Sequence, residues 1–285
     1  MSEQAPGWVV PAMRAGYSAR AVVYVIIGGL ALAAAITGGQ APEGQSGALD
    51  QLRGWPFGTF LLWVIGIGLW LYAIWRWMCA WMDLEDRGTD GEGLIARTGQ
   101  VVTGIIHAAL GVTAIQLAMG NSGGSGEDSR AEHWTAEVLA MPAGRWIVGA
   151  IGLVIIGAGV FYIYKGYAEK FRRYLRATTT MEKLVPFAKV GLIAFGGVVA
   201  LIGGFVLFAA IQSNAEQAGG FGDAFATIRQ QAYGQVLLGI VAVGLICYAV
   251  YNVIEAGWRV VPKAADSDVI TLAQKAERQA KAAAR

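Results

Sequence analysis

Six apolar stretches long enough to cross a membrane alternate with polar segments along the chain. They cover residues 19–38, 57–77, 100–120, 145–164, 190–211 and 234–254. A helix needs about 20 apolar residues to cross a hydrocarbon core roughly 30 Å thick, so each stretch predicts a transmembrane helix. The segments after the first, third and fifth stretches hold short amphipathic pieces, predicted as interfacial helices: Ala48–Leu52, His133–Leu139 and Asp223–Gln230. The pattern predicts an all-α polytopic membrane protein.

A frame of one cation and two glycines opens every second apolar stretch. It reads RAGYSARAVVYVIIG at Arg14–Gly28 and recurs at Arg97–Gly111 and Lys189–Gly203. The other three helices begin at Gly58, Gly144 and Gly234, each after a turn that is aromatic or contains proline. Two helices return the chain to the same side, so three such units share one orientation. We expect six helices as three tandem two-helix repeats around a pseudo-threefold axis along the membrane normal.

The repeats divide the chain into four parts. We expect repeat one at residues 1–93, repeat two at 94–178, repeat three at 179–262, and a tail at 263–285. The tail sequence predicts a soluble helix on the cytoplasmic side, with Ser267 as its N-cap and Glu277 paired with Lys281 at i,i+4.

Composition and charge placement agree with a membrane protein. The chain is 55% hydrophobic and 15% charged, whereas soluble domains carry about 25% charged residues. Segments on the side of the N-terminus hold 18 Lys and Arg, and the opposite loops hold four: Arg53, Arg130, Arg145 and Arg229. Cations stay on the cytoplasmic side, so we expect both termini there. The first stretch is interpreted as a retained helix rather than a removed signal. A net charge of +2 does not indicate nucleic acid as a partner.

Several motifs resemble a known bacterial family. The sequence RAGYSAR–VVY–IG at Arg14–Gly28, GALD at Gly47–Asp50 and PFG–L–GL–Y at Pro56–Tyr72 are similar to a membrane family catalogued as domain of unknown function twelve-oh-six. The resemblance spans roughly residues 12–262 and is sharpest in repeat one. It implies a six-helix bacterial membrane protein with three two-helix repeats, and we expect this chain in the inner (plasma) membrane. It implies no activity and no site residues.

Three polar residues within the apolar stretches differ between the repeats. Arg20 corresponds to Thr103 and Phe195, and Tyr24 corresponds to His107 and Val199. Ionisable groups inside a membrane are functional candidates by default. His107 fits proton transfer, a quinone contact, haem ligation or a neutral histidine bonded to a neighbouring helix. We expect Arg20 to reach lipid headgroups or to pair with a carboxylate such as Glu255.

Small and basic residues form two further candidate sets. Stripes of small residues predict close helix packing, with a pore lining as the alternative: Gly28, Gly111, Gly203, Gly196, Ala200 and Gly204. Cations at the helix boundaries are interpreted as lipid or topology anchors. A basic run predicts contact with anionic lipid or a cytoplasmic partner: Lys170, Arg172, Arg173 and Arg176. Five tryptophans between Trp63 and Trp81 are interpreted as interfacial anchors.

The sequence predicts no catalytic, cofactor-binding or metal-binding residues. It holds no GxxxxGK[ST], HExxH, GxSxG or CxxC motif. Cys79 and Cys247 occupy non-equivalent repeat positions and do not indicate a disulfide. The first hypothesis is a non-enzymatic structural or accessory subunit that contacts membrane lipids, a membrane protein complex or a second copy of itself. The alternative is a small-solute or ion transporter or channel with a cavity between repeats, near His107 and Arg20. A third is an intramembrane enzyme or cofactor protein.

Overall fold

The structure, a computed structural model, describes residues 6–39, 44–121, 127–264 and 270–283. Six helices are long and apolar enough to cross a membrane: α1 (Val9–Thr37), α3 (Gly58–Met82), α4 (Gly91–Ala118), α6 (Gly144–Tyr167), α7 (Thr179–Gln212) and α9 (Gly234–Trp258). Each contains the greater part of one predicted stretch, and the described chain has no strand beyond isolated bridges. The all-α membrane fold is confirmed.

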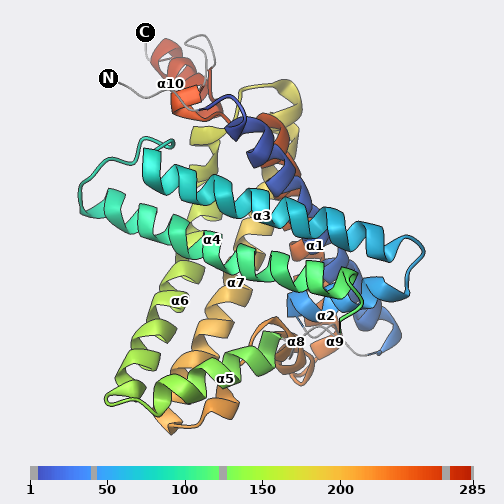
Figure 1. Cartoon of the computed structure of the whole chain (residues 1–285). Helices are drawn as coiled ribbons and strands as arrows, with labels where there is room; N and C mark the ends of the chain where they lie inside the picture. The colour runs from blue at the N-terminus through green and yellow to red at the C-terminus, as the bar shows by residue number, and fades with distance from the viewer. Residues whose placement is uncertain (1–5, 40–43, 122–126, 265–269, 284–285) are drawn as a thin grey trace.

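Three short helices join the long ones at one end of the molecule. They are α2 (Gly44–Gln51), α5 (Glu127–Leu139) and α8 (Phe221–Arg229), and each overlaps one predicted interfacial helix. All three contact one another. Figure 1 shows them from the middle right to the bottom of the view, beside ends of the long helices, while the start of α1 and the helix α10 (Leu272–Ala283) lie at the top. We call these the loop end and the termini end.

The long helices form three antiparallel pairs: α1 with α9, α3 with α4, and α6 with α7. Each pair joins the second helix of one repeat to the first helix of another. In Figure 1, α3 and α4 run across the view whereas α6 and α7 run down it, so the pairs cross one another steeply. The recurring glycines Gly28, Gly111 and Gly203 lie where the two helices of a pair meet, against α9, α3 and α6 respectively. A Cβ on Gly111 would come within 2.9 Å of the Trp70 ring. Small residues allow this close approach of the backbones.

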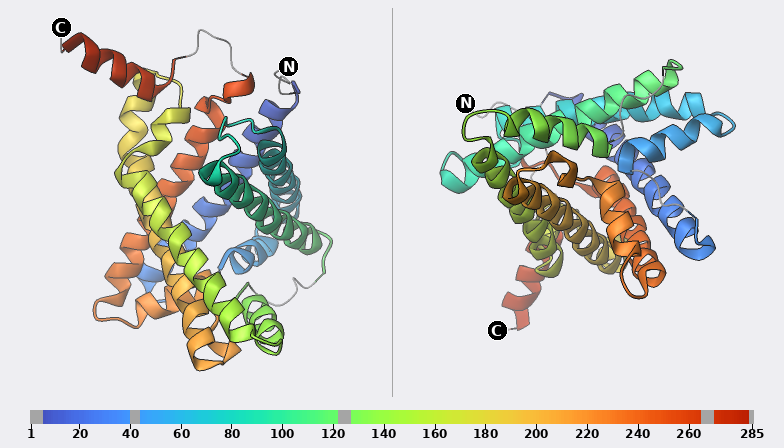
Figure 2. Two further views of the ribbon diagram at one scale, coloured as in Figure 1. Left: turned by 90° about the vertical axis from the view of Figure 1, so that its left-hand side faces the viewer. Right: turned by 90° about the horizontal axis from the view of Figure 1, so that it is seen from below.

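The pairs are joined by contacts within repeats, and these differ between repeats. In repeat one α1 packs on α3, and in repeat three α7 packs on α9. Among the described residues, α4 and α6 of repeat two form no comparable interface. The left view of Figure 2 shows α1 and α9 behind the interval between α4 and α6. Around the molecule each long helix packs on the next in the order α1, α3, α4, then α6, α7, α9 and back to α1, with no comparable interface between α4 and α6 in the described chain. The threefold axis itself stays a prediction.

The same turn precedes the second helix of every repeat. Phe57, Ala143 and Tyr233 have φ values of 62°, 62° and 60°, in the left-handed region that non-glycine residues rarely adopt. The following glycine begins α3, α6 or α9, and a Cβ there would collide with a backbone carbonyl of the preceding helix. This explains why Gly58, Gly144 and Gly234 recur. The same positive-φ residue followed by glycine brings each loop-end segment close to the start of its long helix, and the surrounding packing maintains the strained conformation.

Two of the long helices, α4 and α7, begin at a side-chain cap. Asp90 accepts the Gly93 N–H at 2.9 Å and begins α4, and Thr178 accepts the Met181 N–H at 3.2 Å and begins α7. The tail helix is capped by Thr271 rather than by Ser267, which lies outside the described residues. Thr271 and Gln274 bond reciprocally, as in a capping box. The predicted Glu277–Lys281 ion pair is present at 2.7 Å.

Candidate functional site

The side chain of Arg20 lies at the centre of the helix assembly. It is 4% exposed, although it carries a positive charge within an apolar helix. Its Nη1 donates to the hydroxyl of Tyr72 at 2.7 Å, and its Nη2 donates to that of Tyr248 at 2.8 Å. The guanidinium carbon is 4.6 Å from the Tyr72 ring centroid and within 6.0 Å of the Tyr17, Tyr24 and Tyr248 rings. Aromatic faces partly compensate the lost hydration of the cation.

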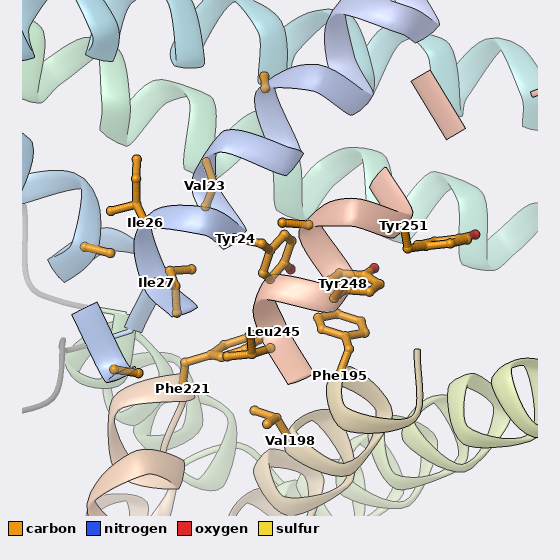
Figure 3. Close-up of a cluster of buried hydrophobic side chains, with 14 of the residues drawn as sticks. Val23, Tyr24, Ile26, Ile27, Phe195, Val198, Phe221, Leu245, Tyr248 and Tyr251 are labelled. Carbon is orange, nitrogen blue, oxygen red and sulfur yellow. The ribbon is translucent and has the colours of Figure 1, made fainter. Parts of the chain in front are cut away.

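All six long helices contribute a side chain to this region. We call the following set the Arg20 centre: Arg20 and Tyr24 of α1, Tyr72 of α3, His107 of α4, Tyr162 of α6, Phe195 of α7 and Tyr248 of α9. Figure 3 shows Tyr24, Phe195 and Tyr248 packed together. Phe195 stacks on Tyr248 at a centroid distance of 4.1 Å, and Tyr24 meets Tyr248 edge-on at 4.7 Å. The Tyr162 ring lies 5.0 Å from Phe195. These rings fix the position of the Tyr248 hydroxyl.

His107 lies beside Arg20 but is held by its own helix. Its ring centroid is 4.7 Å from that of Tyr72, and its Nδ1 lies 2.8 Å from the carbonyl oxygen of Thr103. A carbonyl only accepts, so Nδ1 carries the proton and Nε2 is the acceptor of the neutral ring. His107 therefore joins the centre through its ring contact with Tyr72. In the described chain, no group of three or more His, Cys, Asp and Glu side chains is arranged to hold a metal ion.

Arg20 has donors that no protein group uses. A guanidinium offers five N–H donors, and two are bonded to tyrosine hydroxyls. The buried Nε has no hydrogen-bond partner. Within the described residues Arg20 also makes no ion pair. The expected pairing with Glu255 is wrong, because Glu255 is bonded to Arg259 and Tyr251 one turn on either side along α9.

A second polar cluster lies at the termini end and was not predicted. Arg259 bridges two carboxylates: its Nη2 is 2.7 Å from Glu85, and its Nη1 bonds Glu255. Glu85 also forms ion pairs with Arg87 at 2.9 Å and with Arg76 at 3.5 Å. We call this set, with Tyr251 and Lys165, the termini-end network. Lys165 of α6 donates to the Tyr251 hydroxyl at 2.9 Å, and Tyr251 donates to Glu255. The network ties α3, α6 and α9 together.

The ionisation of Glu85 follows from three neighbouring cations. Burial alone would raise the pKa of this carboxyl, but the charges of Arg259, Arg76 and Arg87 hold it well below its usual range. Burial would likewise lower the pKa of Arg259, and the carboxylates of Glu255 and Glu85 raise it above its usual value. Both groups are therefore charged at neutral pH. Glu85 and Arg259 are far apart in the sequence, so no periodic pattern indicated that they would pair.

The predicted packing and basic residues occupy different surroundings. Gly196 and Ala200 both lie against Gly159 of α6. Gly204 is a correction: a Cβ there would meet no described atom within 4 Å, so it is not at a helix crossing.

The four cations of the basic run lie in different surroundings. Residues Lys170–Tyr174 form a 3-10 turn with Phe171 and Tyr174 buried, so the cations do not share one continuous face. Arg172 pairs with Glu169 at 2.9 Å, and Lys170 lies over the Tyr164 ring at 5.8 Å. Arg173 lies over the Tyr174 ring, and the backbone of Arg176 bonds to Trp258.

Comparison with known proteins assigns the family. Three segments, residues 15–83, 98–169 and 190–259, each match the family described as Domain of Unknown Function DUF1206. The chain belongs to the DUF1206 family. The resemblance read from the sequence is thereby confirmed. A relative is the uncharacterized protein YxxB of Bacillus subtilis (strain 168), 30% identical over 260 residues that cover 90% of this chain and 93% of that protein. No solved structure matches this DUF1206 protein.

Proposed function

We propose that this protein lies in the bacterial inner (plasma) membrane with its termini end in the cytoplasm. The support is the distribution of 18 Lys and Arg against four, together with the placement of the start of α1 and of α10 at one end. Topology reporters test it. A fluorescent protein fused after Arg285 is expected to fluoresce, and a single cysteine at Arg145 is expected to react with an impermeant maleimide from outside. The opposite pattern would invert the orientation.

We further propose that the protein binds an organic anion at the Arg20 centre, as a non-enzymatic binding or transport protein. One observation supports this over the other hypotheses. Arg20 is buried among six helices, makes no ion pair in the described chain, and leaves its Nε–H without a partner. An uncompensated buried charge costs several kcal/mol by order of magnitude. A bound anion would offset that cost, so we expect the centre to select one.

Binding and flux assays test the proposal directly. The purified protein in nanodiscs is expected to gain thermal stability with small organic anions, and proteoliposomes are expected to take up the anion that stabilises most. Arg20→Gln should remove both effects. Arg145→Gln, at an exposed loop-end position, is the matched control and should retain them. Equal responses of Arg20→Gln and the unaltered protein would refute the role of the centre.

The accessory-subunit hypothesis has an observation of its own. α6 packs extensively on α7 alone, and side chains along its length remain exposed. Its exposed residues include Trp146, Val154 and Phe161. Exposed apolar surface faces lipid as readily as protein, so this observation is compatible with a partner helix but does not select one. Purification in mild detergent separates the two functions. A stoichiometric membrane partner whose capture is lost on Phe161→Arg would favour the accessory role.

A further inference from the structure

The clamp around Arg20 uses two of three equivalent repeat positions. Tyr72 and Tyr248 each lie 14 residues after the glycine that begins their helix, and both accept a hydrogen bond from Arg20. The same position in repeat two is Ala158, on α6, and it is exposed. The equivalent position of repeat two is therefore a small side chain, and α6 reaches the centre instead through Tyr162, four residues further along, whose ring packs on Phe195.

The missing tyrosine coincides with the missing helix interface. A Cβ on Gly16 would lie 2.6 Å from the Cα of Tyr72, and one on Gly191 would lie 2.6 Å from the Cα of Tyr248. The equivalent Gly99 of α4 has no described neighbour within 4 Å. In repeats one and three this glycine packs directly against the helix that carries the tyrosine. The described part of repeat two has no such contact. We call the region between α4 and α6 the open sector.

The open sector borders the Arg20 centre. His107 comes from α4 and Tyr162 from α6, the two helices that flank the sector, and both rings belong to the centre. The flanking helices carry exposed apolar side chains, among them Ile105 and Val154. A molecule approaching from the lipid would thus meet apolar side chains first and the cationic centre after them.

We propose that the open sector admits a long-chain carboxylate from the membrane, whose head group binds Arg20. This inference rests on the proposed function and names its ligand class. The single cation matches one negative charge, and the free Nε–H offers a donor to a planar carboxylate, which arginine binds along one edge. The hydroxyl protons of Tyr72 and Tyr248 supply further donors, because each hydroxyl accepts from Arg20 and can donate elsewhere. The acyl tail replaces lipid between α4 and α6.

The surroundings of Arg20 distinguish this ligand from two others. A neutral lipid would leave the guanidinium without a counter-charge. A doubly charged phosphate group would meet one unpaired cation, since the nearby Arg76 is paired with Glu85 and the other members of the centre are tyrosines, a phenylalanine and a histidine that donates to Thr103. A short, water-soluble carboxylate would satisfy Arg20 but would gain nothing from the apolar sector. A monoanionic head with an apolar tail fits both parts.

Binding of isotopically labelled hexadecanoate to the full chain in nanodiscs tests the inference at about pH 8, where the carboxylate is ionised. We expect saturable binding that unlabelled hexadecanoate displaces. Methyl hexadecanoate, which keeps the tail and loses the charge, should compete at least about 30-fold more weakly. Acetate should compete at least about 100-fold more weakly. Both comparisons use the unaltered protein and do not depend on the folding of a variant.

Two variants locate the site. Arg20→Gln should weaken hexadecanoate binding by about 10- to 100-fold, the range of one lost charge-assisted contact. Ala158→Tyr fills the third clamp position at an exposed site, and we expect at least tenfold weaker binding. Ala150→Tyr, eight residues earlier and also exposed, is the matched control and should bind normally. Equal affinity in Ala158→Tyr and Ala150→Tyr would overturn the open sector as the route.

The remaining outcomes separate this inference from the proposed function. If acetate or another short anion binds with Arg20 dependence and hexadecanoate does not, the anion-binding function stands and the long-chain ligand is wrong. If only anionic phospholipid competes, the head-group class is wrong. If methyl hexadecanoate competes equally with the acid, the guanidinium does not recognise the ligand. If no anion binds, both proposals fail.

Discussion

Repeats one and three close where repeat two stays open, and single residues explain the difference. In repeat one Gly68 of α3 lies against Ala19 of α1, and in repeat three Gly244 of α9 lies against Ala194 of α7. The equivalent residues of repeat two are Val154 and Val102, which are 72% and 49% exposed. In lipid, helices associate through close backbone contact at small residues. We infer that the two larger valines at that point keep α4 and α6 apart.

The difference shows how a repeat protein makes a site from units that share a fold but differ in sequence. A fully symmetric ring would place three tyrosines around its centre and would close it. Here the one repeat that lacks the tyrosine also lacks the glycine–alanine contact, so both changes fall at the same junction. The residues that break the symmetry at the centre, Arg20 and His107, lie next to that junction. Function is expected where the repeats differ, because equivalent positions already serve packing.

The largest expected effect is a loss of stability when the termini-end network is broken. Glu85→Gln leaves Arg259, Arg76 and Arg87 without their shared carboxylate, which separates the ends of α3 and α9. Breaking a buried ion pair costs about 3 to 5 kcal/mol. Thermal unfolding in detergent should show a lower midpoint. Glu277→Gln, in an exposed pair of the tail helix, should leave the midpoint unchanged.

Acid should weaken the same contact in the unaltered protein. The folded pKa of Glu85 is depressed, so its ionisation stabilises the fold above the usual carboxyl pKa near 4.5. That contribution is lost as the pH falls below 4.5 and through the folded value. Unfolding midpoints measured between about pH 7 and pH 3 should converge for the unaltered protein and Glu85→Gln. A constant difference across this range would show that Glu85 does not titrate as inferred.

Glycine substitutions compare the closed and open junctions at one repeat position. Gly16→Ala and Gly191→Ala place a methyl against the backbone of Tyr72 or Tyr248, and overpacking of this kind costs about 1 to 3 kcal/mol. Gly99→Ala meets no described neighbour, and helix propensity should stabilise it by up to about 1 kcal/mol. The signs should therefore be opposite in thermal unfolding. If Gly99→Ala destabilised the protein, a methyl group at this position would have to clash with a neighbour, which would indicate that α6 packs against α4 after all.

Sequence reasoning reached the membrane fold, the repeats and the short loop-end helices, because these depend on local apolar runs and recurring glycines. It also marked Arg20, Tyr24 and His107 as the positions to inspect, from their differences between repeats. It did not find their tyrosine partners, since Tyr72 and Tyr248 are 52 and 228 residues from Arg20. The one available signal was that Tyr72 and Tyr248 both lie 14 residues after the glycine that begins their helix.

Other features depend on which helices meet and could not be read locally. Trp75, interpreted as an interfacial anchor, is fully buried, because α3 turns this face toward the core beside Tyr17 and Cys79. Glu85 and Arg259 come together only when the ends of α3 and α9 converge. The valines of repeat two are ordinary in an apolar helix. They become informative only after Gly68 and Gly244 are known to lie at a crossing.

The smallest expected effect comes from restoring the small residues to repeat two. Val102→Ala with Val154→Gly recreates the residue pair of the closed junctions, so we expect α6 to approach α4. A cysteine at Ala158, in a Cys247→Ser background, reports this through its reaction with a lipid-soluble maleimide. Labelling should slow by about tenfold, equivalent to about 1.4 kcal/mol. A cysteine at Ala150 controls for a general change along α6. Unchanged labelling at both positions would mean that the valines do not hold the sector open, and that the missing tyrosine is the cause.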